Sequence, residues 1–117
     1  GHFHMYAPEP IPYARDRYAK EVQRLHRVLE TRLAQAEWLA GDEYSIADIA
    51  TFPWIRFPER RGIDLDQFPA LRRWHDAIAA RPAVARGVAV LAENQRRGPI
   101  SDAERENLFG TTQFQAR

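Results

Sequence analysis

Histidines have the widest chemical range of the side chains in this sequence, and they do not gather into a site. His2 and His4 would share one side of an extended segment, but two imidazoles without a third ligand nearby make a poor metal site. His26 and His75 have charged neighbours, and no serine or cysteine is placed beside them as a nucleophile. We therefore expect no metal site, and we expect surface or helix-cap positions for His26 and His75.

Carboxylates and nucleophiles give equally little indication of catalysis. Asp16, Asp48, Asp64 and Asp66 occur singly or beside basic residues, so no pair stands out for general acid–base work. The sequence has no cysteine, which excludes disulfides, thiolate metal ligands and a cysteine nucleophile. It also lacks a glycine-rich loop for a nucleotide phosphate. We expect no catalytic residue within the chain.

Aromatic residues offer a candidate binding surface. Phe52, Trp54 and Phe57 could line a hydrophobic pocket, but aromatic residues at helical spacing are more often core. The candidate substrate-pocket residues are Tyr13, Phe52 and Trp54. The nearby arginines, Arg56 among them, are more often solvated than ligand-binding.

The elements that must position these residues begin with a long helix over residues 12–36. Its apolar residues recur every three or four positions, which places them on one helical face; they are Tyr18, Val22, Leu25, Leu29 and Leu33. Pro12 suits the first turn, where its missing N–H costs nothing.

A capping box predicts a second helix. Ser45 can accept a hydrogen bond from a first-turn N–H and Asp48 can reach back to the Ser45 N–H, the two bonds that define this motif. We predict Ser45 and Asp48 as structural N-cap residues. The helix that follows, to about residue 57, is apolar nearly all round, which is typical of the centre of a bundle, and Pro53 should kink it.

Further helices are predicted over residues 69–81 and 84–93, and a second capping box, Ser101 with Glu104, predicts a short helix that Gly110 ends. No strand pattern or repeat is present. The predicted fold is all-α, with a helical domain over residues 1–93 and a tail over 94–117 that contains a short helix.

Composition limits the partners. The 117 residues include 17 Lys and Arg interleaved with 16 Asp and Glu, for a net charge of +1. This balance gives no reason to expect nucleic acid or an anionic membrane as a partner, and no apolar stretch approaches the roughly 20 residues that cross a bilayer. We expect one globular domain in the cytoplasm.

The segment from Trp38 to Trp54, with Gly41, Tyr44-Ser45-Ile46-Ala47-Asp48 and Pro53, resembles the capping-box region of glutathione S-transferase C-terminal domains. Phe68-Pro69-Ala70-Leu71, Trp74 and Arg81-Pro82-Ala83-Val84 follow at the spacing typical of that family. Ala7-Pro8, Ile11-Pro12-Tyr13-Ala14 and Arg17-Tyr18 are similar to the bacterial Nu-class branch, whose members act as glutathione-dependent disulfide-bond reductases.

This resemblance implies a helical bundle without most of its first helix and without the family's thioredoxin-like domain. It also implies a homodimer in which Arg17 reaches the glutathione that the other subunit mainly binds. Without the resemblance, Arg17 would be read as an exposed helix charge paired with Glu21. The expected function is the hydrophobic-substrate and dimer-contact half of a glutathione transferase or disulfide reductase, and we expect the chain alone to be inactive. The alternative is a non-catalytic interaction module. Where the missing helix would pack, we expect an uncovered apolar patch.

Overall fold

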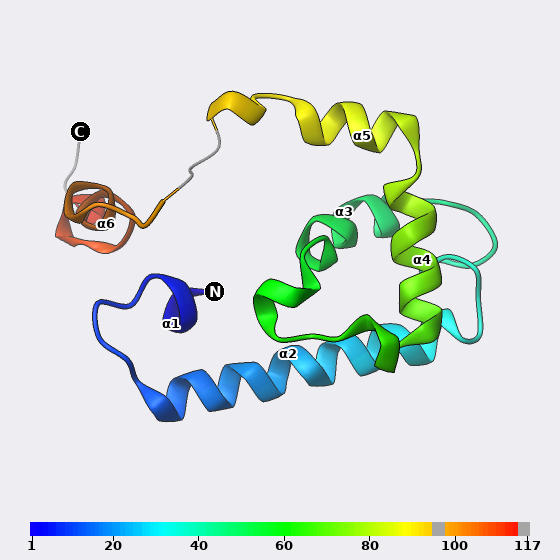
Figure 1. Cartoon of the computed structure of the whole chain (residues 1–117), viewed down its shortest axis with the longest axis horizontal. Coiled ribbons are helices and arrows are strands. Elements are labelled where there is room, and N and C mark those ends of the chain that lie inside the picture. Colours follow the sequence, from blue (N-terminus) through cyan, green and yellow to red (C-terminus); the bar gives the residue numbers. More distant parts are fainter. Residues whose placement is uncertain (95–97, 115–117) are drawn as a thin grey trace. The chain divides into compact units, whose positions relative to one another are not determined.

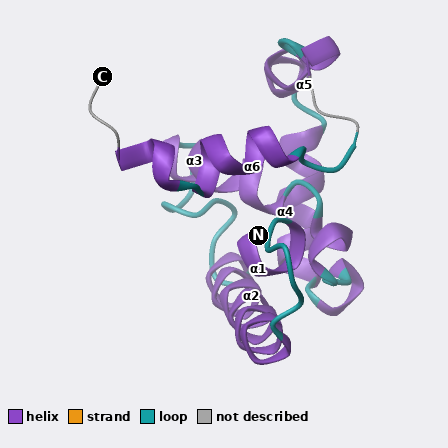
Figure 2. Cartoon of the chain, turned by 90° about the vertical axis from the view of Figure 1, so that its left-hand side faces the viewer, coloured by secondary structure: helices purple, strands orange, loops and turns teal. Residues whose placement is uncertain are grey.

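The computed structural model describes residues 1–94 and 98–114, and within these ranges it consists of helices and loops without a strand (Figure 2). The predicted all-α fold is therefore confirmed. The α-helices are α1 (His2–Met5), α2 (Pro12–Leu33), α3 (Ile46–Ile55), α4 (Pro69–Ala79), α5 (Pro82–Ala89) and α6 (Asp102–Phe109). The 3-10 turns are η1 (Pro58–Arg61), η2 (Leu65–Gln67), η3 (Ala92–Asn94) and η4 (Thr111–Phe114).

The helices belong to two compact units, which we describe separately. One unit is Asp16–Val90, and it contains most of α2 together with α3, α4 and α5 (Figure 1). The other joins Gly1–Arg15 to the segment that begins at Leu91, and so brings α1 and α6 together. Of the predicted tail over residues 94–117, positions 95–97 and 115–117 lie outside the described residues.

Helix α2 presents its predicted apolar stripe only in part to the core. Leu33 is buried, and Val22 and Leu29 pack against the core cluster, but Tyr18 and Leu25 are 54% and 47% exposed. The helix ends at Leu33, three residues earlier than predicted.

The prediction for His26 is wrong, because its ring is only 2% exposed on the inner face of α2. Its Nδ1 lies 2.7 Å from the Val22 carbonyl oxygen. Since a carbonyl can only accept, Nδ1 carries the proton of this bond and Nε2 presents a lone pair. No partner for that Nε2 occurs within the described part of the chain.

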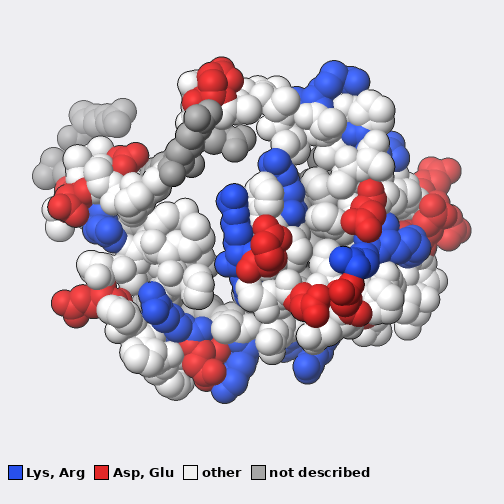
Figure 3. Space-filling view, in the orientation of Figure 1, with Lys and Arg blue, Asp and Glu red and all other residues white. Residues whose placement is uncertain are grey.

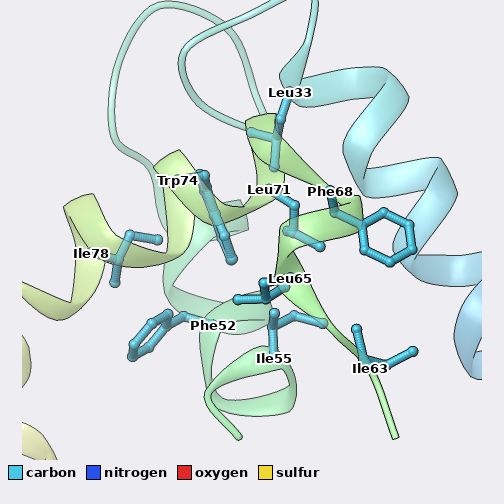
Figure 4. Close-up of a cluster of buried hydrophobic side chains, with 9 residues drawn as sticks. All are labelled: Leu33, Phe52, Ile55, Ile63, Leu65, Phe68, Leu71, Trp74 and Ile78. Carbon is cyan, nitrogen blue, oxygen red and sulfur yellow. The ribbon is translucent and has the colours of Figure 1, made fainter. Parts of the chain in front are cut away.

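The core is formed where α3, α4 and the segment between them meet the end of α2 (Figure 4). Leu71, Trp74 and Ile78 recur at helical spacing along α4 and are completely buried. The other core side chains are Leu33, Phe52, Ile55, Ile63, Leu65 and Phe68. Burial of this cluster is what fixes α3 on α4, because apolar area removed from water is the dominant stabilising contribution.

Helices α2 and α4 also cap each other. The Glu30 carboxylate accepts hydrogen bonds from the Ala70 and Leu71 amides, at 3.1 and 2.8 Å, at the start of α4. Phe68, the N-cap residue of α4, offers no side-chain cap of its own. In return, the Arg73 guanidinium donates to carbonyls at the end of α2, including that of Leu33 at 3.0 Å. Each helix thus satisfies terminal backbone groups of the other.

The last predicted helix of the larger unit is shorter than expected. Helix α5 ends at Ala89, and η3 follows as a separate turn. The second capping box, by contrast, is present: the Glu104 amide donates to Ser101 Oγ and the Ser101 amide to the Glu104 carboxylate. Gly110 ends α6 in an extended rather than a left-handed conformation, with φ −89°.

Candidate functional site

Helix α3 buries one side and leaves an apolar surface on the other. Asp48, Phe52 and Ile55 point to the core, whereas Ile46, Ile49 and Trp54 are 83%, 54% and 68% exposed. We call these three residues the outer face of α3. The expectation that α3 lies at the centre of a bundle is therefore met on one side only. A group of exposed large apolar side chains is the kind of surface that packs against a partner.

The capping box that begins α3 is built as predicted and extends further than predicted. Asp48 Oδ2 accepts from the Ser45 amide at 2.9 Å, and the Ala47 amide donates to Ser45 Oγ at 3.2 Å. Asp48 Oδ1 accepts in addition from Trp74 Nε1 at 2.7 Å and from the Leu39 amide at 3.0 Å. The carboxylate thus ties the loop before α3 to α4.

Burial opposes ionisation of Asp48 and raises its pKa, but the hydrogen bonds from Leu39, Trp74 and Ser45 outweigh burial and hold the pKa below the usual value. Such bonds favour the charged form because they are donated to it. Asp48 is a carboxylate at neutral pH, with both oxygens occupied. It holds the fold together and is not available for proton transfer.

Arg17 lies on the exposed side of α2 in a group with more positive than negative charge. Arg24 makes two hydrogen bonds to Glu21, at 2.9 and 2.8 Å. Arg17 approaches the same carboxylate only at 3.6 Å, and 58% of its side chain is exposed. The hydrogen bonds from Arg24 lower the pKa of Glu21. Two guanidinium groups therefore share one carboxylate, and Arg17 lies farther from it than Arg24 does.

The candidate pocket residues Phe52 and Trp54 do not share a surface of α3, and Tyr13 belongs to the other compact unit. Phe52 is 6% exposed in the core, Trp54 lies on the outer face of α3, and Tyr13 is 81% exposed at the start of α2. Residues two apart on a helix point to opposite sides, so Phe52 and Trp54 cannot contact one ligand from the same side. A shallow, open hollow of about 400 Å³ lies elsewhere, on α2, lined by Arg24, Arg27, Val28, Thr31, Arg32 and Gln35.

Other chemistry-bearing groups are dispersed. No group of three or more metal-ligating side chains occurs in the part of the chain that the structure describes. His75 Nδ1 lies 3.0 Å from Oδ1 of its neighbour Asp76.

Basic and acidic side chains alternate over the face shown in Figure 3, without a broad region of one sign. Across residues 1–94 and 98–114, no helix has both the length and the apolar character to span a membrane.

The helical core, the capping box and the apolar surface of α3 describe an all-α domain that can be compared with known families. The family model for the glutathione S-transferase C-terminal domain matches residues 8–82. The chain therefore belongs to the glutathione S-transferase family through this domain.

Among curated proteins, the chain is 48% identical over 87 residues to the disulfide-bond oxidoreductase YfcG of Escherichia coli, covering 74% of this chain and 40% of that protein. It is 38% identical over 109 residues to the disulfide-bond oxidoreductase YghU of the same organism, covering 87% of this chain and 37% of the relative. The chain thus spans about two-fifths of the length of these relatives.

Two solved structures have the same fold. A glutathione transferase homologue from Lodderomyces elongisporus, with two glutathione molecules per subunit, superposes with a TM-score of 0.72 at 35% identity, covering 77% of this chain and 44% of that one. A glutathione transferase from Burkholderia graminis, also with two glutathione molecules per subunit, gives a TM-score of 0.66 at 42% identity, covering 83% and 42% of the two chains.

Proposed function

We propose that this chain is the helical half of a glutathione-dependent disulfide-bond reductase. Support comes from the identity to two proteins named disulfide-bond oxidoreductases and from two solved relatives that hold glutathione. Glutathione is the substrate of the complete protein. The helical half contributes a wall for the second substrate and a contact between subunits, and the chemistry on sulfur belongs to a thioredoxin-like domain.

Within this function, Arg17 binds glutathione that the partner subunit of a homodimer holds. The observation that carries this assignment is the uneven sharing of Glu21, whose two oxygens bond to Arg24 and leave Arg17 at 3.6 Å. A guanidinium in this state can take a carboxylate of glutathione through two parallel charge-assisted bonds. An exposed helix charge that served only to pair with Glu21 would contribute little to helix stability.

The test is the Arg17→Met variant of the complete gene product. Hydrogen bonds to charged groups contribute about 1.5 to 3 kcal/mol, so we expect the KM for glutathione to rise about tenfold or more. Lys20→Met is the matched control, because Lys20 is an exposed cation on the same helix that pairs with Asp16. If Arg17→Met and Lys20→Met both keep the wild-type KM, Arg17 has no role in binding glutathione.

The outer face of α3 is the proposed contact for the rest of the protein. Its apolar side chains are not covered by the described residues of their own unit, and we propose that a thioredoxin-like domain covers them. Tyr13, Phe52 and Trp54 remain our proposed contacts for the hydrophobic substrate; the rings of Tyr13 and Trp54 are open to solvent, whereas Phe52 lies in the core. A reducing cytoplasm suits a sequence without cysteine.

The competing function is a non-catalytic interaction module, for which the exposed face of α3 would also serve. The relatives named as oxidoreductases favour the enzyme. The Arg17→Met variant separates the two functions. The enzyme should lose affinity for glutathione in this variant, whereas an interaction module should bind its protein partner with unchanged affinity.

A further inference from the structure

Helix α1 is too short to be stable by itself. It spans the four residues His2–Met5 and has no side-chain cap at its start. Isolated helices of fewer than about 12 residues are marginal in water, so contacts from elsewhere must hold α1. The structure shows these contacts within the unit that joins Gly1–Arg15 to the C-terminal segment.

Two arginines from different helices bind the carbonyl end of α1. Arg15, in the first turn of α2, donates from Nε to the Phe3 carbonyl at 3.0 Å. Arg105, in α6, donates to the carbonyl of Tyr6, the C-cap residue of α1. Carbonyl groups at a helix C-terminus lack helical partners and carry partial negative charge, so cations are favourable there.

Helix α6 also packs an aromatic ring on α1. The ring of Phe109 meets His2 edge-on with ring centres 4.6 Å apart, and lies 5.6 Å from the ring of Tyr6. The Ser101–Glu104 capping box fixes the start of α6. Helix α6, nearly a hundred positions further along the chain, therefore contacts both ends of α1.

The position of α1 bears on the start of α2. Residues 7–11 connect the two helices, and Pro8 and Pro10 restrict this connector, because each proline fixes φ near −65°. A restraint on Tyr6 is thus transmitted to Pro12, directly before Tyr13 and about one turn before Arg17. Arg15 adds a second link from α2 to α1.

We propose that α6 is a strap that fixes α1, and that Arg105 is a positioning residue for the glutathione-binding surface at the start of α2. The contacts of α1 support the strap by themselves. Only the effect of the strap on glutathione binding rests on the proposed role of Arg17. Arg105 does not touch the ligand; it limits the conformations of the segment that leads to Tyr13 and Arg17.

Hydrogen exchange of the full chain tests the strap. The Tyr6 and Ala7 amides both donate to the His2 carbonyl, and in Arg105→Met they should exchange about tenfold faster. Arg105→Lys keeps a donor and should stay within about threefold of wild type. The control is Arg86→Met, an exposed arginine on α5. The Leu71 amide should keep its wild-type rate in all variants. Wild-type exchange of Tyr6 and Ala7 in Arg105→Met would overturn the strap.

Kinetics of the complete gene product test the positioning role. Arg105→Met should raise the KM for glutathione about fivefold with kcat within about twofold of wild type, and Arg105→Lys should restore most of the loss. If Arg105→Met keeps the wild-type KM while Arg17→Met raises it, the positioning role of Arg105 is wrong and the proposed role of Arg17 stands. If Arg17→Met also keeps the wild-type KM, the proposed function fails, and hydrogen exchange still decides the strap.

Discussion

At the residue scale, Asp48 does most to join separate parts of the chain. Its two oxygens accept from the loop amide of Leu39, from the N-cap residue Ser45 and from Trp74 on α4. A buried charge is costly unless hydrogen bonds replace its hydration, and here they do. Removing the charge would leave the indole N–H of Trp74 and the Leu39 amide without an anionic acceptor.

We therefore predict that Asp48→Asn loses about 3 kcal/mol of unfolding free energy at pH 7, measured by urea denaturation. The pKa of Asp48 is lowered in the folded state, whereas an unfolded aspartate has a pKa of about 4. Its stabilising contribution is thus complete above about pH 5 and is lost as the pH falls through the unfolded and then the folded pKa. The difference between wild type and Asp48→Asn should shrink accordingly at pH 3.

Asp42→Asn, in the exposed loop before α3, is the control and should change stability by less than about 0.5 kcal/mol. A gap between wild type and Asp48→Asn that is equally large at pH 7 and pH 3 would contradict the assignment of a buried carboxylate.

Only the local half of this arrangement could be predicted from the sequence. Ser45 and Asp48 are three residues apart, so their capping box is a short-range pattern. The bond from Trp74 crosses 26 positions and depends on how α4 packs. His26 shows the same limit: its polar type and charged neighbours indicated the surface, but the turn of α2 directs it inward.

At the element scale, prolines and capping boxes predicted where helices begin, and tertiary contacts decided where they end. Pro12, Pro69 and Pro82 each begin a helix, because a proline is tolerated in the first turn. The early end of α2 coincides with the carbonyls that Arg73 binds. The hydrogen bonds of Glu30 and Arg73 join positions about 40 apart, so no local sequence pattern predicts them.

The apolar surface of α3 and α2 leads to a prediction at this scale. Ile46, Ile49 and Trp54 on α3, with Leu25 and Val28 on α2, remain exposed. We expect the purified chain to bind an apolar dye and to self-associate with rising concentration in sedimentation experiments, since such surfaces drive association. Trp54→Glu should weaken both effects, whereas the control Arg86→Glu should not. A monomer at all concentrations that binds no dye would contradict the prediction.

At the scale of the whole molecule, family membership is established by the match over residues 8–82. The chain corresponds to about two-fifths of YfcG. The described residues contain helices only, so no thioredoxin-like sheet lies among them. The sequence predicted this class because its capping box and prolines are fold-forming. Residues that bind a ligand carry no such local pattern, and Arg17 was singled out by resemblance alone.

The most direct test replaces the C-terminal domain of YfcG with this chain and measures glutathione-dependent reduction of a mixed disulfide. We predict that the chimera is active, that its Arg17→Met variant has a raised KM for glutathione, and that the 117-residue chain alone shows no turnover. A chimera that unfolds cooperatively on heating yet has no glutathione-dependent activity, or turnover by the chain alone, would contradict the assignment of this chain as the helical half of a disulfide-bond reductase.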